Sequence, residues 1–359
     1  MISKRLAVLK KALHRLRQPI TVMEVCGTHT VSIFRHGLRT MLPENLRLVS
    51  GPGCPVCVTA QGEVDTAIAL AEREDLILAT YGDMIRVPGS HGTLSDKRAQ
   101  GARISVVLSA MDALALAWRY PDHQVVFLGV GFETTAPATA ALILQAKKEA
   151  ISNLSVLCLH KKVPPALNVL ASREKRNMDA LLLPGHVAVI LGKRPFEFLP
   201  KRYGIPCAIA GFEPDEILLG LAMLLDQIAS GSPKVDLCYP RVRPQGNPKA
   251  QALMDRIFRS GAATWRGLGS IEHSGLEIAP EYADFDASRR FSVPLREVPE
   301  PTGCRCGDVL IGEIDPDGCP LFSTLCTPTD PVGPCMVSSE GTCSAWHQYA
   351  RRQHELCRH

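Results

Sequence analysis

The sequence of 359 residues has no long apolar run, few aromatic residues and no strong excess of either charge. A membrane-spanning helix needs about 20 consecutive apolar residues. Residues 1–19 instead carry six basic side chains where a signal peptide would have its apolar core. Aromatic residues make up only 5%, and 40 basic residues are mixed with 36 acidic ones, which argues against nucleic-acid binding. We therefore expect a cytoplasmic protein that binds neither membrane nor nucleic acid.

Cysteine, in contrast, is abundant, with 13 residues. An odd number in a chain without an export signal argues against a static disulfide framework and favours metal binding or redox chemistry. Not every cysteine shares this expectation. Cys158, Cys207 and Cys238 stand alone among apolar or prolyl neighbours, so we interpret them as small buried thiols without a chemical role.

Residues 20 to about 230 alternate short apolar runs with helical patterns, which is typical of parallel strands joined by crossover helices. The expected strands are 20–25, 46–50, 76–80, 104–108, 124–130, 154–160, 180–183 and 207–210. The expected helices are 62–74, 110–120, 137–148 and 214–228. The fold class is therefore α/β, with two Rossmann-like parallel-sheet domains that face a central cleft and a smaller, irregular α+β domain.

We expect the domain boundaries to follow the changes in pattern. Residues 1–19 form a docking helix, because Leu6, Leu9, Leu13 and Leu16 make one apolar stripe. Residues 20–120 form the first α/β domain and residues 121–232 the second. Residues 233–359 contain Pro- and Gly-rich segments and the seven last cysteines, and we expect them to need a metal to fold.

The unusual residues of the α/β part follow the ends of the predicted strands. In open parallel sheets the carboxyl ends of the strands line the ligand-binding crevice, so these residues are expected on one rim. They are Cys26-Gly27-Thr28-His29, Cys54-Pro55-Val56-Cys57, Tyr81-Gly82-Asp83, Gly131-Phe132-Glu133-Thr134-Thr135, Pro184-Gly185-His186 and Gly211-Phe212-Glu213.

Cys54 and Cys57 lie in a turn shaped by Gly51-Pro52-Gly53, between a predicted strand and a predicted helix. Two thiols at this spacing can ligate a metal or form a reversible disulfide, and a helix N-terminus would lower their pKa. The alternative is a turn that holds two buried thiols without reactivity.

Cys26 and His29 form a second candidate pair. The Cys26 thiolate could bind a soft metal, with His29 as a further ligand, an acid-base group or a donor that orients the sulfur. A helix cap by Thr28 or Thr30 over a packed cysteine explains the same residues.

Glu133 and His186 are the candidates for proton transfer on the rim. Glu133 lies in a segment that begins like a dinucleotide fingerprint, but Thr134 stands where the third glycine belongs. We therefore expect Glu133 to exchange a proton rather than to belong to a nucleotide site. His186 is either a second such group or a histidine satisfied within its loop.

The C-terminal cysteines Cys304, Cys319, Cys326 and Cys343 are separated by 14, 6 and 16 residues. Zinc sites usually contain close Cys-x-x-Cys pairs, and such long, unequal gaps fit a [4Fe-4S] cluster better. Zinc stays an alternative, and Cys306 could replace Cys304 as a ligand. Cys306 and Cys335 are otherwise spare.

Taken together, these segments closely resemble the HypD family, the maturation factors of nickel-iron hydrogenases. The matching segments are Cys26 to His29, Gly51 to Cys57, Gly131 to Pro137, Pro184-x-His186-Val187 with Gly192, and the spacing of the four C-terminal cysteines. They occur in order along nearly the whole chain. One departure is Ala188, where family members often carry serine.

The resemblance implies a scaffold that assembles the Fe(CN)2CO group of the hydrogenase together with a small partner, HypC. It implies that Cys26 binds the iron, that Cys54 and Cys57 act as a redox pair or as further iron ligands, and that HypE donates cyanide as a thiocyanate. Cys304, Cys319, Cys326 and Cys343 would hold the [4Fe-4S] cluster that supplies electrons. The expected activity is redox chemistry on a scaffold rather than conventional turnover.

Two other functions compete with this one. An iron-sulfur-dependent thiol-disulfide reductase would use the Cys54–Cys57 pair on a protein substrate. A structural zinc protein would bind its partners through the N-terminal helix.

Overall fold

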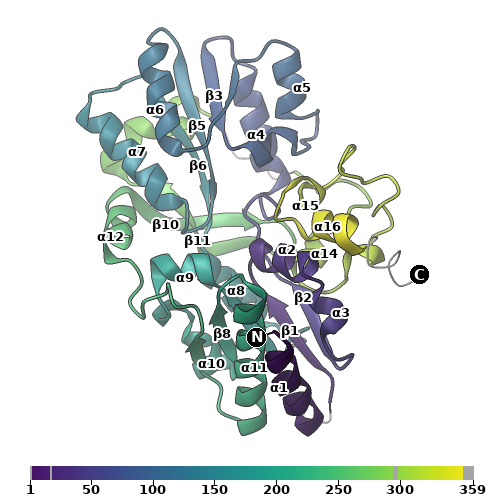
Figure 1. The fold of residues 1–359 in the computed structure, drawn as a ribbon. Helices are drawn as coiled ribbons and strands as arrows, with labels where there is room; N and C mark the ends of the chain where they lie inside the picture. Colours follow the sequence, from purple (N-terminus) through teal and green to yellow (C-terminus); the bar gives the residue numbers. More distant parts are fainter. Residues whose placement is uncertain (1, 17, 294–297, 351–359) are drawn as a thin grey trace.

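The computed structural model describes residues 2–16, 18–293 and 298–350, and it contains two parallel sheets (Figure 1). The five-stranded sheet has the order β2-β1-β7-β8-β9 and the four-stranded sheet the order β4-β3-β5-β6. All eight predicted strands are present within a few residues, which confirms the α/β fold class. Their bounds are β1 Ile20–Glu24, β2 Leu46–Ser50, β3 Leu76–Thr80, β4 Ile104–Val106, β5 Gln124–Gly131, β6 Leu154–His160, β7 Ala180–Pro184 and β8 Cys207–Ala210.

Helices fill the connections between these strands and continue through the C-terminal part. The four helices predicted within residues 20–230 are present as α4, α6, α7 and α11. The α-helices are α1 Ile2–Leu16, α2 Gly27–Arg35, α3 Leu38–Met41, α4 Gln61–Ala71, α5 Leu94–Ala99, α6 Ala110–Arg119, α7 Ala136–Lys148, α8 Val163–Ser172, α9 Gly185–Leu191, α10 Phe198–Tyr203, α11 Pro214–Ser230, α12 Pro248–Ile257, α13 Ala287–Arg290, α14 Cys306–Leu310, α15 Pro334–Val337 and α16 Thr342–Ala345. Short helical turns are η1 Gly82–Arg86, η2 Arg194–Phe196, η3 Pro280–Phe285, η4 Pro316–Gly318 and η5 Trp346–Ala350.

The strand order corrects the expected division at residue 120. The chain makes β1 and β2 in the five-stranded sheet, crosses to make β3 to β6 in the other, and returns for β7 and β8. Residues 20–120 and 121–232 therefore each contribute strands to both sheets. Apolar strand patterns look alike in both sheets, so the sequence shows where strands lie but not which strands are neighbours. The first crossing runs through the Cys54–Cys57 turn.

The N-terminal helix packs on the protein itself. Leu9 and Leu13 are 0% and 1% exposed and belong to one apolar cluster with residues of α11. Figure 1 shows α1 beside α11 at the outer end of the five-stranded sheet. The leucine stripe of α1 therefore packs against α11 of the same chain.

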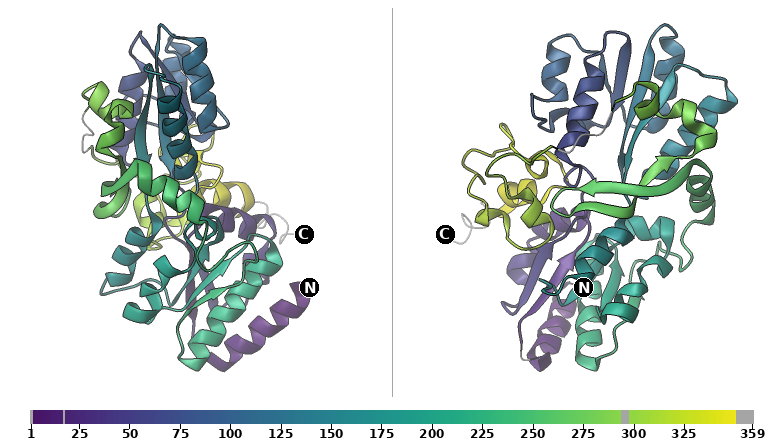
Figure 2. Two further views of the ribbon diagram at one scale, coloured as in Figure 1. Left: turned by 90° about the vertical axis from the view of Figure 1, so that its left-hand side faces the viewer. Right: turned by 180° about the vertical axis from the view of Figure 1, so that it is seen from behind.

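Residues 235–278 are more regular than expected. Strand β9 (Val235–Leu237) pairs with β8, so the five-stranded sheet extends past the expected boundary at 233. Strands β10 (Phe258–Trp265) and β11 (Gly269–Ile278) form an antiparallel hairpin. Figure 2 shows this hairpin between the two sheets, with its turn directed at the cysteine-rich C-terminal segment.

The last residues of the chain lie outside the described ranges. They include Cys357 and the end of the domain expected at 233–359. Within residues 2–16, 18–293 and 298–350, no helix combines the length and the hydropathy needed to cross a bilayer.

Candidate functional site

Four of the six predicted rim segments follow strands at which the order of each sheet reverses, whereas the Cys54–Cys57 turn follows β2 and Gly211-Phe212-Glu213 follows β8. In the five-stranded sheet the reversal is between β1 and β7, whose ends lead to Cys26 and His186. In the four-stranded sheet it is between β3 and β5, whose ends lead to Asp83 and Glu133. Such switch points are the usual ligand sites of open α/β sheets. The topology therefore supports the positions that the sequence singled out.

Cys26 and the Gly51-to-Cys57 turn are in direct backbone contact. The Gly27 amide donates to the Gly53 carbonyl over 3.2 Å. A Cβ atom placed on Gly53 would lie 2.3 Å from the Cys26 nitrogen. Glycine is thus required at position 53 by a close approach between two chain segments, which brings Cys26 beside Cys54 as expected.

Cys26 itself is the N-cap residue of α2 and is 7% exposed. Burial raises the pKa of its thiol to about 12, although the Thr28 and His29 amides act in the opposite direction. Neither threonine of this motif caps the helix. Thr28 donates to Glu340, and Thr30 donates to Glu24. The structure therefore disfavours the helix-cap interpretation of this motif.

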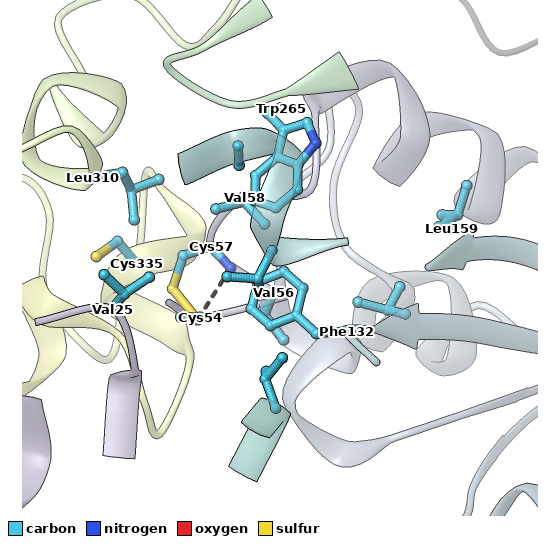
Figure 3. Close-up of a cluster of buried hydrophobic side chains, with 14 of the residues drawn as sticks. Val25, Cys54, Val56, Cys57, Val58, Phe132, Leu159, Trp265, Leu310 and Cys335 are labelled. Atoms are coloured by element: carbon cyan, nitrogen blue, oxygen red, sulfur yellow. Dashed lines mark hydrogen bonds between the residues drawn. A yellow bond between two sulfur atoms is a disulfide. The ribbon is translucent and has the colours of Figure 1, made fainter. Parts of the chain in front are cut away.

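Cys54 and Cys57 form a disulfide, and both side chains are almost completely buried. Helix α4 begins only at Gln61, after the intervening residues 58–60. The pair consequently lies in the crossing turn and not in the first turn of a helix, which corrects the reason given for its reactivity. Figure 3 shows the disulfide between Val25 and Cys335 on one side and Val56 on the other.

A loop from the C-terminal segment touches both sulfur motifs of the α/β part. Ser338 Oγ lies 3.4 Å from Cys54 Sγ and donates to Asp83 Oδ2 over 3.1 Å. Glu340 accepts a hydrogen bond of 2.5 Å from Thr28, next to Cys26. The loop is flanked by Cys335 and Cys343, so the two cysteine systems that lie at opposite ends of the sequence are adjacent in space.

His29 and His186 both contact the ring of Phe212. The Phe212 ring centroid is 4.8 Å from that of His29 and 3.9 Å from that of His186. His29 is fully buried, its Nε2 is 2.9 Å from the Gly211 carbonyl, and burial lowers its pKa to about 4. A carbonyl can only accept, so Nε2 carries the proton and the lone pair is on Nδ1. Nδ1 has no hydrogen-bond partner among the described residues.

Glu133 is held against helix α8. Its Oε1 accepts a 3.0 Å hydrogen bond from the Val163 amide, while its Oε2 has no partner in the described part of the chain. Burial raises its pKa to about 7. A carboxyl group with such a pKa can exchange a proton near neutrality. This hydrogen bond joins Glu133 to α8 and not to Cys26 or to the disulfide, so its predicted role stays a prediction.

Glu24 was not among the predicted site residues, and it links the Cys26 motif to the end of β2. Its carboxyl group accepts from Thr30 Oγ1 over 2.8 and 2.9 Å and from Ser50 Oγ over 2.8 Å. One hydroxyl belongs to the Cys26 motif and the other directly precedes Gly51. Burial raises the pKa of Glu24 to about 8. A charged residue in an apolar strand was the signal available in the sequence.

Lys161 and Glu63 form a buried ion pair that was not predicted. Lys161 Nζ donates to Glu63 Oε1 over 2.6 Å and to Oε2 over 2.9 Å. Lys161 follows β6, and Glu63 lies in the first turn of α4. The two side chains come from distant segments, so the sequence offered no signal for their pairing.

Six C-terminal cysteines line one cavity beside this centre. The lining includes Cys304, Cys306, Cys319, Cys326, Cys335 and Cys343. Burial raises the pKa of Cys304 to about 12, and the amides of Cys343 and Val332 donate to the sulfurs of Cys335 and Cys326. The four predicted cluster ligands are therefore brought together.

The donor set of this cavity fits a cluster bound by thiolates. Four cysteines suffice for a [4Fe-4S] cluster, and backbone amides that donate to sulfur are a usual feature around such groups. Within residues 2–16, 18–293 and 298–350, no three His, Cys, Asp or Glu side chains are already arranged around one ion position. Cys306 and Cys335 share the cavity, and their thiols contact each other.

The three cysteines expected to have no role lie elsewhere. Cys207 and Cys238 are buried near the middle and edge of the five-stranded sheet, and Cys158 is half-buried on β6. Burial raises the pKa of Cys158 and Cys238 to about 12. These thiols are thus not activated.

The chain is similar to known proteins along its whole length. A family model named HypD, with the description "Hydrogenase formation hypA family", matches residues 1–350. The hydrogenase maturation factor HypD of Cupriavidus necator is 44% identical over 359 residues, covering 98% of this chain and 95% of that protein. Its counterpart of the same name in Escherichia coli is 43% identical, covering 94% and 91%. A putative hydrogenase expression/formation protein of Methanocaldococcus jannaschii is 40% identical, covering 96% and 98%.

Proposed function

This chain belongs to the HypD family and has a role in hydrogenase maturation, and from that premise we propose that it is the scaffold on which the Fe(CN)2CO group is assembled. The observation that carries the proposal is that three cysteine-containing segments lie in contact with one another. Cys26 touches the Cys54–Cys57 turn, and the loop between Cys335 and Cys343 touches both. A buried centre of this kind suits an iron adduct that must be kept from water and oxygen.

Cys26 is the proposed thiolate for the iron, which is the cargo of the scaffold. Because burial raises its pKa to about 12, Cys26 is a thiol at neutral pH, and the incoming iron must displace its proton. Soft thiolate ligands suit iron that carries cyanide and carbon monoxide. Cys54 and Cys57 are the candidates for further ligands when their disulfide is reduced.

Nδ1 of His29 is suited to accept a hydrogen bond or to bind a metal, and it has no proton to donate. The pKa of about 4 keeps the His29 ring neutral, and the Nε2 proton is engaged by Gly211. The free Nδ1 lone pair can bind a metal or receive a proton transiently. His29 is therefore not the proton donor. We assign that role to Glu133, because its pKa of about 7 lies near the working pH. His186, which stacks on Phe212 beside His29, is the second candidate for proton transfer.

The Cys54–Cys57 pair has the stoichiometry that cyanide release requires. Cleavage of the bond between the sulfur and the cyanide carbon of a thiocyanate consumes two electrons and two protons. It yields a thiol and hydrogen cyanide. A dithiol that closes to a disulfide supplies two electrons and two protons. We propose that this pair works in that way on the thiocyanate carried by HypE, and that HypC shares the iron with Cys26.

The proposed cluster at Cys304, Cys319, Cys326 and Cys343 would supply one-electron transfer when bound. Two such transfers and two protons return the disulfide to the dithiol. The contact between Ser338 and Cys54 holds the pair against the loop that joins Cys335 to Cys343. A cytoplasmic location is part of the proposal, because a reversible disulfide needs a reducing environment.

The experiment is infrared spectroscopy of the purified complex with HypC after loading with iron. We expect cyanide and carbonyl stretches in the wild-type complex, their loss in Cys26→Ala, and their retention in Cys158→Ala as the matched cysteine control. Retention of both bands in Cys26→Ala would contradict the proposed iron site.

A second experiment tests the proposed cluster. Anaerobic purification should give a brown protein with iron and sulfide. A colourless protein with stoichiometric zinc would instead support the structural zinc alternative.

Thiol-disulfide reduction of an external protein is the second candidate, and the Cys54–Cys57 disulfide favours it. The burial of both sulfurs, with exposures of 3% and 0%, opposes access by a protein substrate. Turnover of disulfide substrates without HypC would support this candidate.

A further inference from the structure

The turn of the β10–β11 hairpin, residues 265–268, lies between the two sulfur systems, and we call it the hairpin tip. The Arg266 amide donates to the Val58 carbonyl over 3.0 Å, directly after Cys57. On the other side, a Cβ atom on Gly267 would lie 2.5 Å from the Gly307 carbonyl oxygen, directly after Cys306. Gly267 has a φ of 80°, so both its conformation and its close contact favour glycine. The tip is thus in backbone contact with both segments.

Arg266 places a buried positive charge at this junction. Its side chain is 0% exposed. The guanidinium Nε donates to the Thr59 carbonyl over 3.1 Å, and Nη2 is 3.4 Å from Gln61 Oε1. Nη1 pairs with Glu300, whose side chain is 42% exposed. The charge is therefore fixed in place by groups that follow the Cys54–Cys57 turn.

The same guanidinium interacts with the cysteines of the cavity, whose segment the hairpin tip contacts at Gly307. Burial lowers the pKa of Arg266, whereas Cys306, Cys304, Glu63 and Cys335 raise it. Arginine stays charged at all relevant pH values. Charges interact more strongly in a buried site than in water, so a fixed cation favours whichever state of the sulfur centre carries more negative charge. For an iron-sulfur cluster that state is the reduced one.

We propose that Arg266 is a positioning residue of the thiol chemistry, which holds the segment after Cys57 against the cysteine cavity and raises the reduction potential of the sulfur centre in that cavity. The proposal rests on the proposed function, because it assigns a role to Arg266 in the electron supply to Cys54 and Cys57. Arg266 touches neither iron nor substrate in this role.

The test is a redox titration of the anaerobically purified full chain. The cluster is followed by its visible absorption, and the cysteines by alkylation and mass spectrometry. In Arg266→Met we expect the affinity of the cavity centre for an electron to fall at least tenfold, which is a shift of about 59 mV to lower potential for one electron. Arg259→Met is the matched control, because Arg259 lies on the same hairpin but is 51% exposed, and its potentials should equal those of the wild type.

Glu300→Gln should change the reduction potential in the direction opposite to Arg266→Met. It keeps the proposal testable if Arg266→Met does not fold. Glu300→Gln removes the counter-charge of Arg266 from an exposed position, so it should raise the potential. Arg266→Lys should keep most of the wild-type potential, because it keeps the charge. Unchanged potentials in both Arg266→Met and Glu300→Gln would overturn the assignment of Arg266.

Failure of the proposed function gives a different result. A wild-type protein without iron-sulfur absorption refutes the proposed cluster. The alkylation rate of the cavity cysteines still measures the influence of Arg266 in that case. A nearby cation favours the reactive thiolate, so alkylation should be slower in Arg266→Met than in the wild type, and equal rates would overturn the assignment.

Discussion

The buried pair of Lys161 and Glu63 gives the sharpest stability prediction. Their side chains are 2% and 8% exposed, and the two N–O distances are 2.6 and 2.9 Å. Lys161→Met removes the cation and leaves the Glu63 carboxylate buried, with the Ala60 amide as its remaining donor at 2.8 Å. Removing one partner of a buried ion pair costs about 3–5 kcal/mol. We expect a loss of that size in the free energy of unfolding.

The matched variants separate an uncompensated charge from lost packing. Lys161→Met combined with Glu63→Gln should recover most of the loss, because the glutamine is neutral and can still accept from Ala60. The exposed pair of Lys201 and Glu197, at 74% and 31% exposure, provides the control. Lys201→Met should cost less than about 0.5 kcal/mol, since exposed helical pairs contribute little.

The assay is urea unfolding followed by circular dichroism and by tryptophan fluorescence. Coincident transitions from both signals justify a two-state free energy for a chain with two sheets. The reasoning fails if Lys161→Met costs no more than Lys201→Met. It also fails if the double variant is as unstable as the single one.

Three further predictions concern the candidate site and its frame. Burial raises the pKa of Glu24 from 4.5 to about 8, so its stabilising contribution is complete below pH 4.5 and is lost as the pH rises through 8. Across this pH range the melting temperature should fall less steeply in Glu24→Gln than in the wild type. Equal slopes in the two proteins would refute the raised pKa of Glu24. Gly53→Ala should cost at least about 1–3 kcal/mol and expose Cys26 to alkylation, because its Cβ meets backbone at 2.3 Å. Gly82→Ala, where the nearest atom is a side-chain carbon at 3.7 Å, is the control. Leu13→Ala should cost about 2–5 kcal/mol in urea unfolding and release α1 to proteolysis, whereas Val8→Ala, at a residue that is 57% exposed, should do neither.

Much of the local structure was predictable from short-range patterns. The eight strands and the helix that carries Leu9 and Leu13 follow from apolar periodicity, which depends only on neighbouring residues. The expected division at residue 120 was wrong about the sheets because strand order depends on contacts between distant segments. The hairpin of β10 and β11 was missed, since its residues alternate weakly between buried and exposed.

The candidate site shows the same limit. Cys26, Cys54 and Cys57 were predicted together because each follows the end of a strand, and parallel strands end on a common edge. Glu24 and Arg266 were not predicted. Arg266 has no periodic signal, and Glu24 is marked only as a charged residue in an apolar strand. Their importance appears only when burial removes them from water and makes the charge costly or influential.

The sequence alone determined which residue types are present and, to within a few residues, where strands β1 to β8 and helices α4, α6, α7 and α11 lie. It thereby determined that reactive sulfur would lie at strand ends and in a cysteine-rich C-terminal segment. Tertiary structure alone decided that the Cys54–Cys57 turn is the crossing between the two sheets, and that the hairpin tip joins this turn to the C-terminal cysteines. The physical reason is that propensity acts between neighbours in the chain, whereas burial, pairing of charges and close backbone contact depend on segments that only folding brings together.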